Sequence, residues 1–450
     1  MGMVTEEDAM RMWVAGVCVA MLPATVAADP VALHDGFGYS DAVLRAELTT
    51  LRGMSDASGP RRHLGAAGYH RVRGELAASN RAARQCLDET REAPPALQGM
   101  AFLCESTLAG NALIEGDIGR WASLMLRVRE DYQRTIVPLL KADDEVPDVT
   151  RPTFAAFTSW PRSALPVAER GQDVAVPIQF SNELPSVTLT LHGTRDGRPF
   201  THEASFIVDT GAARSHISRT LAASLGLTVT ENFVVSRILD GDIQQAGLVA
   251  PIDIELGGQR VRDVSFNSEA ARELNLIGLD VLRALGRLRL SRETLTLLGA
   301  QTPAACTRRM VFTSSLWGPF QQVRFPIRGR EDNLMLVDSG FHGAFQMRGA
   351  PRASVPAAAI QRRNVITTRG AEDIEYAPAS TPLQIADTVT SVPVDIAFQP
   401  PDLFPSSWRI GYGVTGGHDV VLDLPGGIGC LVPRPPEPPL LGGPRPRDEA

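Results

Sequence analysis

A short apolar run that ends in Asp-Thr-Gly constrains this chain more than any other feature of its sequence. Residues 206–208 are Phe-Ile-Val, and Asp209-Thr210-Gly211 follows them directly. An apolar run of this kind is typical of a buried strand. Glycine permits a sharp turn of the backbone just after the acid. The carboxylate of Asp209 is therefore expected at a tight turn where the strand ends, and not along a sheet face.

The same local pattern occurs a second time, 129 residues later. The apolar residues 334–337 lead into Asp338-Ser339-Gly340, and each copy is followed at similar distance by a hydrophobic-glycine pair, Ile277-Gly278 or Ile410-Gly411. A single Asp-Ser/Thr-Gly is expected by chance in roughly a few tenths of chains of this length. The shared context of the two copies therefore predicts an internal repeat of two β units, each carrying one acid.

The chain divides into regions of different character, and its 450 residues suit two or three domains. Residues 29–145 have helical periodicity and predict an all-α N-terminal domain. The proline-interrupted stretch 146–175 is predicted as a linker. Alternating β patterns then predict one unit over 176–302 and a second over 303–432. The tail, 433–450, is rich in proline and glycine and is predicted to be disordered.

The first residues have the pattern of a secretory signal. Arg11 precedes an apolar stretch over 12–26, and the small residues Ala27 and Ala28 follow. We predict a signal peptide over 1–28 and an exported protein, periplasmic or secreted, that is not inserted in a membrane after cleavage. The alternative is an uncleaved anchor, although the apolar stretch is shorter than the roughly 20 residues of a spanning helix.

Four cysteines lie outside the predicted signal, and they allow three connectivities. We favour Cys86 with Cys104 and Cys306 with Cys430. Helices are predicted over 41–51, 69–87 and 96–113, and a helical hairpin around the intervening prolines would bring the first two cysteines together. An oxidising compartment makes disulfides plausible. The alternative is four buried free thiols.

Charge and motif content exclude several function classes. The net charge of −7, without a basic block, gives no case for nucleic-acid binding. No His/Cys/Asp spacing indicates a zinc site, and the sequence has neither a Gly-x-Ser-x-Gly elbow nor a phosphate-binding loop. We expect no metal and no organic cofactor.

On these motifs the chain resembles the aspartic proteases, and its first β unit resembles the retropepsin-like kind. Asp209-Thr210-Gly211-Ala212, Ser215 and Ile277-Gly278 match that pattern. The resemblance is specific over 200–298 and looser over 323–424. It implies a mainly β, bilobal acid-protease fold, with two retropepsin-like β-barrel lobes related by a pseudo-twofold axis. Both acids lie in one chain, as in the pepsin-like arrangement, so one chain would make the whole site.

The resemblance also implies roles for individual residues. Asp209 and Asp338 would be the catalytic dyad, in which two close carboxyls share a proton because both cannot ionise easily. The ionised acid takes a proton from water, and the protonated acid supports the oxyanion. Four further residues would orient the dyad. The hydroxyls of Thr210 and Ser339 would form hydrogen bonds across it, and Gly211 and Gly340 would let their backbone amides approach the carboxylates.

A flap is expected over the cleft of such a protease. The candidates are hairpins around Asp240-Gly241 in the first unit and Arg369-Gly370 in the second. An ordinary surface hairpin is the alternative at each place.

The second unit departs from the family pattern. Phe341 follows Gly340 where Ala, Ser or Thr is usual, and Ala344 stands where the first unit has Ser215. Neither Ala212 nor Phe341 offers a hydroxyl to a carboxylate, which predicts a dyad less acidic than the pepsin-like one and activity towards neutral pH.

Three functional hypotheses follow. The leading one is an aspartic endopeptidase that cleaves peptides or proteins with the Asp209/Asp338 dyad. A variant has the first unit dimerising with another chain. The alternative class is a catalytically inactive protease-fold protein that binds peptides or acts as a scaffold, with the helical domain docking a protein partner. The helical domain is open to three roles: inhibitory prosegment, substrate recruiter or assembly module.

Overall fold

The structure is a computed structural model that describes most of the chain. It describes residues 30–91, 95–136, 154–163, 171–181, 183–237, 243–269, 273–318, 320–326, 334–367, 370–385, 388–398 and 408–434. The predicted signal and the tail from residue 435 lie outside these ranges, as do Asp240, Gly241 and Arg369. Within these ranges, no helix is long and apolar enough to cross a membrane.

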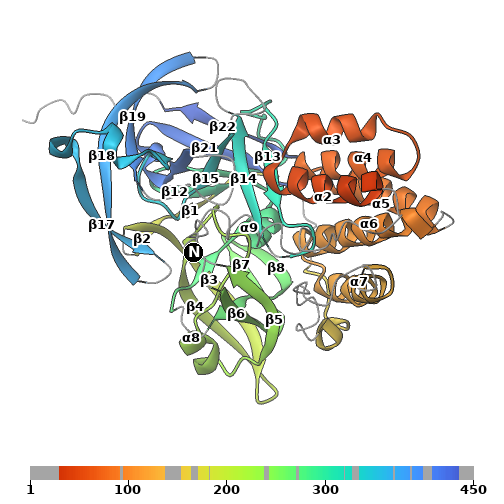
Figure 1. The fold of residues 1–450 in the computed structure, drawn as a ribbon. Coiled ribbons are helices and arrows are strands. Elements are labelled where there is room, and N and C mark those ends of the chain that lie inside the picture. The colour runs from red at the N-terminus through yellow and green to blue at the C-terminus, as the bar shows by residue number, and fades with distance from the viewer. Residues whose placement is uncertain are drawn as a thin grey trace, which may run out of the picture.

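The N-terminal part is helical and stacks on one side of a mainly β region (Figure 1). Consecutive helices from α3 to α7 pack on one another. The helices are α2 (Pro30–Arg45), α3 (Leu48–Ser55), α4 (Pro60–Val72), α5 (Leu76–Arg91), α6 (Pro95–Ile114) and α7 (Ile118–Asp131), followed by the short η2 (Tyr132–Ile136) and η4 (Phe154–Phe157).

Two of the predicted helices are each divided in two. The helix predicted over 41–51 breaks at Ala46, whose φ of 57° is left-handed. The helix predicted over 69–87 breaks at Gly74, whose φ is 75°. A left-handed residue ends a helix, and the following amides close its last turn; the amide of Glu75, for example, donates to the carbonyl of His70 at 2.8 Å. The apolar spacing continued across both breaks, so periodicity alone gave no sign of them.

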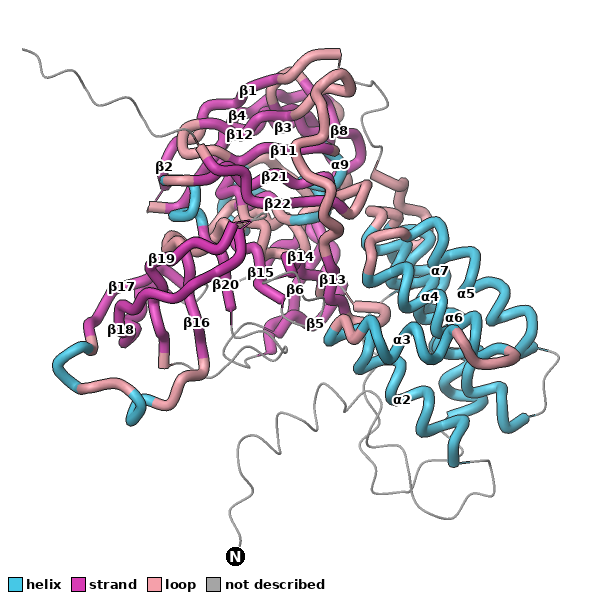
Figure 2. The backbone as a smooth tube through the Cα atoms, turned by 90° about the horizontal axis from the view of Figure 1, so that it is seen from above, coloured by secondary structure: helices cyan, strands magenta, loops and turns pink. Residues whose placement is uncertain are grey.

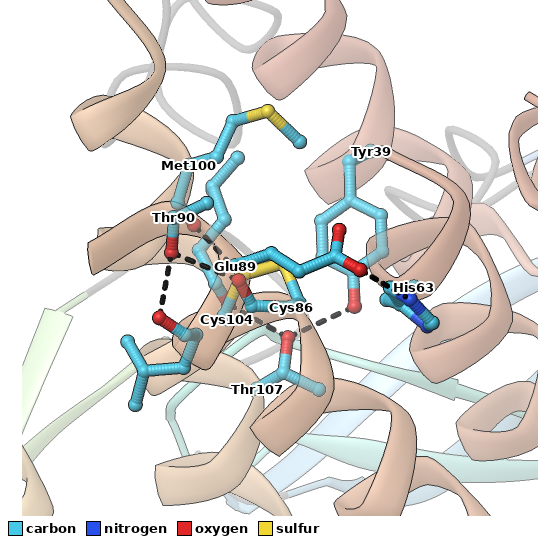
Figure 3. Close-up of a disulfide and its surroundings, with 10 residues drawn as sticks. Tyr39, His63, Cys86, Glu89, Thr90, Met100, Cys104 and Thr107 are labelled. Carbon is cyan, nitrogen blue, oxygen red and sulfur yellow. Dashed lines mark hydrogen bonds and ion pairs between the residues drawn. A yellow bond between two sulfur atoms is a disulfide. The ribbon is translucent and has the colours of Figure 1, made fainter. Parts of the chain in front are cut away.

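The described residues form two disulfides, in the pairing expected from the sequence. Cys86–Cys104 connects α5 to α6 (Figure 3). The hydroxyl of Thr90 donates to the carbonyl of Cys86 beside it, at 2.9 Å. Cys306–Cys430 ties the start of the second β unit to its last strand. The four cysteines are therefore not free thiols.

The first β unit forms a six-stranded and a three-stranded sheet. The larger has the order β10-β4-β3-β7-β8, with β2 paired to β3, and the smaller has the order β5-β6-β9. The elements are β1 (Val174–Pro177), β2 (Gln179–Ser181), β3 (Leu184–Arg195), β4 (Arg198–Val208), α8 (Arg219–Ser224), β5 (Val229–Arg237), β6 (Ile243–Val249), β7 (Ile252–Leu256), β8 (Gln259–Val264), β9 (Asn267–Glu269), β10 (Leu276–Ile277), α9 (Leu279–Leu285), β11 (Arg287–Leu290) and β12 (Thr294–Leu297).

The second β unit is built around an eight-stranded sheet of order β13-β14-β15-β20-β16-β19-β18-β17. Its elements are β13 (Val311–Ser314), β14 (Gln321–Pro326), β15 (Leu334–Asp338), β16 (Phe345–Arg348), η5 (Arg352–Ser354), η6 (Ala357–Ala359), β17 (Gln361–Thr367), β18 (Gly370–Ile385), β19 (Thr388–Ala397), β20 (Trp408–Gly411), η7 (Tyr412–Gly416), β21 (His418–Asp423) and β22 (Ile428–Pro433).

A shared five-stranded sheet joins the two units. Its order is β1-β12-β11-β21-β22, and β11 pairs antiparallel with β21 from Arg287 opposite Asp423 to Leu290 opposite Val420. One buried apolar cluster contains residues of both units, including Leu288 and Leu422. The two units therefore share backbone hydrogen bonds and a hydrophobic core.

The helical part shares a second core with the β units. Phe233 of β5 is fully buried, and its ring centroid lies 5.0 Å from that of Trp121 on α7. The same cluster contains Phe157 of η4 and Val311 of β13. Figure 2 shows β13 facing the helices. The stretch predicted as a linker thus contains a short helix whose phenylalanines are core residues.

Candidate active site

The two acids end equivalent strands in the two units. Val208, just before Asp209 at the end of β4, pairs in parallel with Ile277 of β10, and Asp338 at the end of β15 pairs in parallel with Gly411 of β20. The residue three positions after each acid also makes an equivalent bond. The carbonyl of Ala212 accepts from the amide of Leu279 at 2.9 Å, and that of Phe341 accepts from Tyr412 at 2.7 Å. The repeat read from the motifs is thus also a repeat of hydrogen bonding.

The two turns hold each other through their hydroxyl residues. The amide of Thr210 donates to the hydroxyl of Ser339 at 3.0 Å, and the amide of Ser339 donates to the hydroxyl of Thr210 at 2.9 Å. The Thr210 hydroxyl also donates to the carbonyl of Val337 at 2.9 Å, and the Ser339 hydroxyl to that of Val208 at 2.6 Å. Both residues are buried, so these four bonds are shielded from water.

Each carboxylate lies against the glycine of the opposite turn. A Cβ atom added to Gly340 would lie 2.8 Å from Cγ of Asp209, and one added to Gly211 would lie 2.5 Å from Oδ1 of Asp338. Real Cβ atoms do not approach that closely, so the site requires glycine at both positions. The amides of Gly211 and Ala212 donate to Oδ1 of Asp209 at 2.9 and 3.1 Å. The structure thus brings both predicted acids and their four predicted neighbours to one junction.

Residues 197–284 match a family model described as gag-polyprotein putative aspartyl protease. Over these residues the chain is similar to the retropepsin-like aspartyl proteases. The match confirms the resemblance inferred from the first motif; it includes Asp209, whereas Asp338 lies beyond it.

Several solved structures share a partial likeness with the chain. The basic 7S globulin from soybean is 11% identical with a TM-score of 0.33, over 58% of this chain and 95% of its own. The structure of edgp is 10% identical with a TM-score of 0.34, over 59% of this chain and 95% of its own. Conglutin gamma, a basic 7S globulin from lupine seeds, is 10% identical with a TM-score of 0.32, over 58% of this chain and 95% of its own. No curated protein matched the chain.

Behind the turn of the aspartyl-protease-like segment, Asp280 fixes Ser215. Oδ1 of Asp280 accepts from the amide and hydroxyl of Ser215 at 2.8 and 2.6 Å, and the Ser215 hydroxyl accepts from the amide of Gly278 at 2.9 Å. In the second unit the carbonyl of Ala344 accepts from the amide of Gly411 at 2.9 Å. The sequence motifs singled out Ser215 but not Asp280. Its position at the start of a helix directly after Ile-Gly is the local signal for it.

A cation lies beside the second acid. Nε of Arg409, in β20, is 3.4 Å from Oδ2 of Asp338, an ion pair without hydrogen-bond geometry at Nε. The guanidinium carbon lies 5.5 Å from the centroid of the Phe341 ring. No motif includes Arg409; a charged residue just before Ile410-Gly411, in an otherwise apolar strand, is its only trace in the sequence.

Both predicted flap positions lie between paired strands. Arg237 of β5 pairs with Ile243 of β6, and Thr367 of β17 pairs with Gly370, the first residue of β18. Asp240, Gly241 and Arg369 lie outside the described residues, so the flap assignment stays a prediction. In the described ranges, no group of three or more His, Cys, Asp or Glu residues is arranged to hold a metal ion.

Proposed function

We propose that this protein is an aspartic endopeptidase in which Asp209 and Asp338 of one chain form the catalytic dyad. The observation that carries the proposal is the reciprocal bonding of Thr210 and Ser339. These bonds connect two turns that are far apart in sequence and hold each acid against the glycine of the opposite turn. Two amides and two hydroxyls are buried at this junction, and each has a hydrogen-bond partner on the opposite turn. This arrangement fits a site in which the relative position of the two acids must be fixed.

The chemistry follows from two carboxyls that share one proton. The ionised carboxylate takes a proton from water as the water oxygen bonds to the carbon of the peptide carbonyl. The other carboxyl gives its proton to the carbonyl oxygen. The peptide nitrogen is then protonated, and the C–N bond breaks. None of these steps requires a metal or an organic cofactor.

The proposal includes an architecture and a compartment. Residues 176–302 and 303–432 would be the two lobes of a bilobal acid-protease fold, behind a helical domain over 29–145. The shared β11–β21 pairing supports lobes that meet within one chain. The two disulfides fit a protein exported to the periplasm or secreted. Its substrates would be peptides or proteins, with no role for nucleic acid.

A second candidate is an inactive protease-fold protein that binds peptides in the same cleft and docks a partner on its helices. The sequence of the second unit favours it, because Phe341 follows Asp338-Ser339-Gly340 and offers no hydroxyl to the carboxylate. Turnover separates the two candidates.

Hydrolysis of a mixed peptide library between pH 3 and pH 8 tests the proposal. D209N and D338N are compared with D196N, which changes an acid that is 92% exposed. Loss of cleavage in D209N and D338N, with D196N active, supports the single-chain dyad. Activity retained in a dimeric D338N protein would show that the first unit pairs with another chain. Absence of cleavage in the unmodified protein would leave the peptide-binding candidate.

A further inference from the structure

The ion pair between Arg409 and Asp338 is largely buried, and its guanidinium packs against an aromatic ring. The side chains of Arg409 and Asp338 are 10% and 13% exposed, and their atoms approach to 3.4 Å. The ring of Phe341 lies 5.5 Å from the guanidinium carbon, within the range of a cation–π contact. A charge pair shielded from water in this way is much less screened than one on the surface.

The first unit has no counterpart of this arrangement at the equivalent positions. Leu276 precedes Ile277-Gly278 as Arg409 precedes Ile410-Gly411, and Leu276 is buried in an apolar cluster with Ile207. Ala212 stands where the second unit has Phe341. The cation and the ring that supports it therefore occur together, and on one side of the dyad only. Phe341, which breaks the family pattern, packs where it can support Arg409.

We propose that Arg409 is a positioning residue that fixes Asp338 as the ionised member of the dyad, so that the shared proton resides on Asp209. This inference rests on the proposed function. An opposite charge within about 4–6 Å favours the ionised form of a carboxyl. Two adjacent carboxyls do not both ionise easily, so the remaining proton stays on Asp209. The amides of Gly211 and Ala212 donate to Oδ1 of that acid, which leaves its Oδ2 to carry the proton.

The assignment gives each acid one role in the attack. Asp338 accepts the proton of the water whose oxygen bonds to the carbonyl carbon. Asp209 transfers its proton to the carbonyl oxygen at the same time. The dyad holds one proton before and after this step, now on Asp338, from where it is available to the departing nitrogen.

The described groups near the pair include a second carboxyl and a neutral amide. Asp209 faces it from the first unit, and the neutral Gln346 of β16 lies opposite Arg409 in register. His342 follows Phe341; burial lowers its pKa, and Arg363 of β17, Glu183 and Asp395 of β19 are the charges that act on it. Removal of Arg409 therefore removes the cation paired with Asp338, while His342 is the neighbour whose own titration needs a control.

The first test is the pH dependence of kcat/KM in R409L, which installs the residue of the first unit, and in R409K, which keeps the charge. H342Q controls for the neighbouring imidazole. R283L is the matched control, because Arg283 is equally buried and its guanidinium carbon lies 5.2 Å from the centroid of the Phe312 ring, away from the dyad.

In R409L the acid limb of the profile is expected about one pH unit higher, with roughly tenfold lower activity on that limb. The profiles of R409K, H342Q and R283L are expected to keep the original acid limb. The proposal would be overturned if the acid limb of the R409L profile coincided with that of the unmodified protein. It would also be overturned if the acid limb of R409K shifted as far as that of R409L. R409Q replaces R409L if the leucine variant does not fold.

A measurement without turnover keeps this proposal separate from the proposed function. A carboxylate stabilised by Arg409 contributes stability above its ordinary pKa, and that contribution is lost as the pH falls. R409L should therefore lower Tm more at pH 7 than at pH 3. In a D338N background the effect of R409L should be the same at both pH values. Equal effects at both pH values with Asp338 present would overturn the ion pair, whether or not the protein cleaves peptides.

Discussion

Thr210 and Ser339 each donate a backbone amide to the hydroxyl of the other, at 3.0 and 2.9 Å. The two residues are 129 positions apart in the chain, so the bonds form only when both β units have folded against each other. The geometry of the two acids is thus a property of the interface between units. Substitutions at this interface should affect catalysis and stability together.

Replacing Thr210 by Ala removes a hydroxyl that accepts from Ser339 and donates to Val337. Two buried groups lose a partner, at about 1–3 kcal/mol each, so we expect T210A to lose about 2–6 kcal/mol of unfolding free energy. Misplacement of the dyad should also lower kcat/KM, by up to about a hundredfold. Urea unfolding and peptide hydrolysis measure the two effects. T210S keeps the hydroxyl and should stay close to the unmodified protein; a T210S as impaired as T210A would contradict this account.

Gly340 must remain glycine because a Cβ atom there would lie 2.8 Å from Cγ of Asp209. We expect G340A to fold with altered dyad geometry and to lose most of its hydrolytic activity, at least about a hundredfold. Gly416 is the matched control in the same unit, since nothing lies within 4 Å of its added Cβ. G416A should retain activity. Full activity in G340A, measured on the same peptides, would show that Asp209 is not where the reaction takes place.

The sequence predicted the parts of this site that depend on local pattern. Apolar runs ending in Asp-Ser/Thr-Gly place Asp209 and Asp338 at turns because strand and turn chemistry act over a few residues. The bonds of Thr210 and Ser339, implied by the family resemblance, are present in the structure. The pairing of Cys86 with Cys104 followed from a helical hairpin, which also depends on nearby residues.

The remaining features depend on register between distant strands. Arg409 reaches Asp338 because β20 pairs with β15, with Asp338 opposite Gly411, and no short motif reports that alignment. The helix breaks at Ala46 and Gly74 depend on single left-handed residues, which apolar periodicity does not detect. Phe233 lies in a β strand, and its burial against the helices depends on tertiary packing that no local pattern reports.

His342 should make the protein less stable as the pH falls below neutrality. Burial, with a further contribution from Arg363, holds the pKa of His342 below its ordinary value. Between about pH 7 and pH 5 the unfolded chain binds a proton that the folded protein does not. The free energy of unfolding therefore decreases as the pH is lowered through this range. The Tm difference between pH 7 and pH 5 should be smaller in H342Q. His418, whose pKa is also lowered by burial, accounts for a residual slope. H202Q changes an exposed histidine and should show the same Tm difference as the unmodified protein. If the Tm difference between pH 7 and pH 5 is unchanged in H342Q, the expectation is wrong.

The helical domain is better explained as a permanent part of the protein than as a removable prosegment. The fully buried Arg71 of α4 donates to the hydroxyl of Ser314 and to the carbonyl of Ser315, at 2.9 and 2.6 Å. The indole of Trp121 donates to the carbonyl of Trp317 at 2.9 Å. Cleavage that removed the helices would leave these groups and the apolar face of β13 uncovered.

Phe233 tests whether the helices also support the β5–β6 hairpin, the predicted flap of the first unit. Its ring is fully buried between Trp121 and Phe157, at centroid distances of 5.0 and 5.4 Å. We expect F233A to lose about 3–5 kcal/mol of unfolding free energy, because the cavity opens in the core that the helices share with the β units. F180A makes the same change at a ring that is 58% exposed and should cost under about 1 kcal/mol. If the hairpin closes over substrate, F233A should also raise KM while kcat changes less, since the dyad lies on other strands. A KM equal to that of F180A would assign the helices to stability alone and leave the hairpin independent of them.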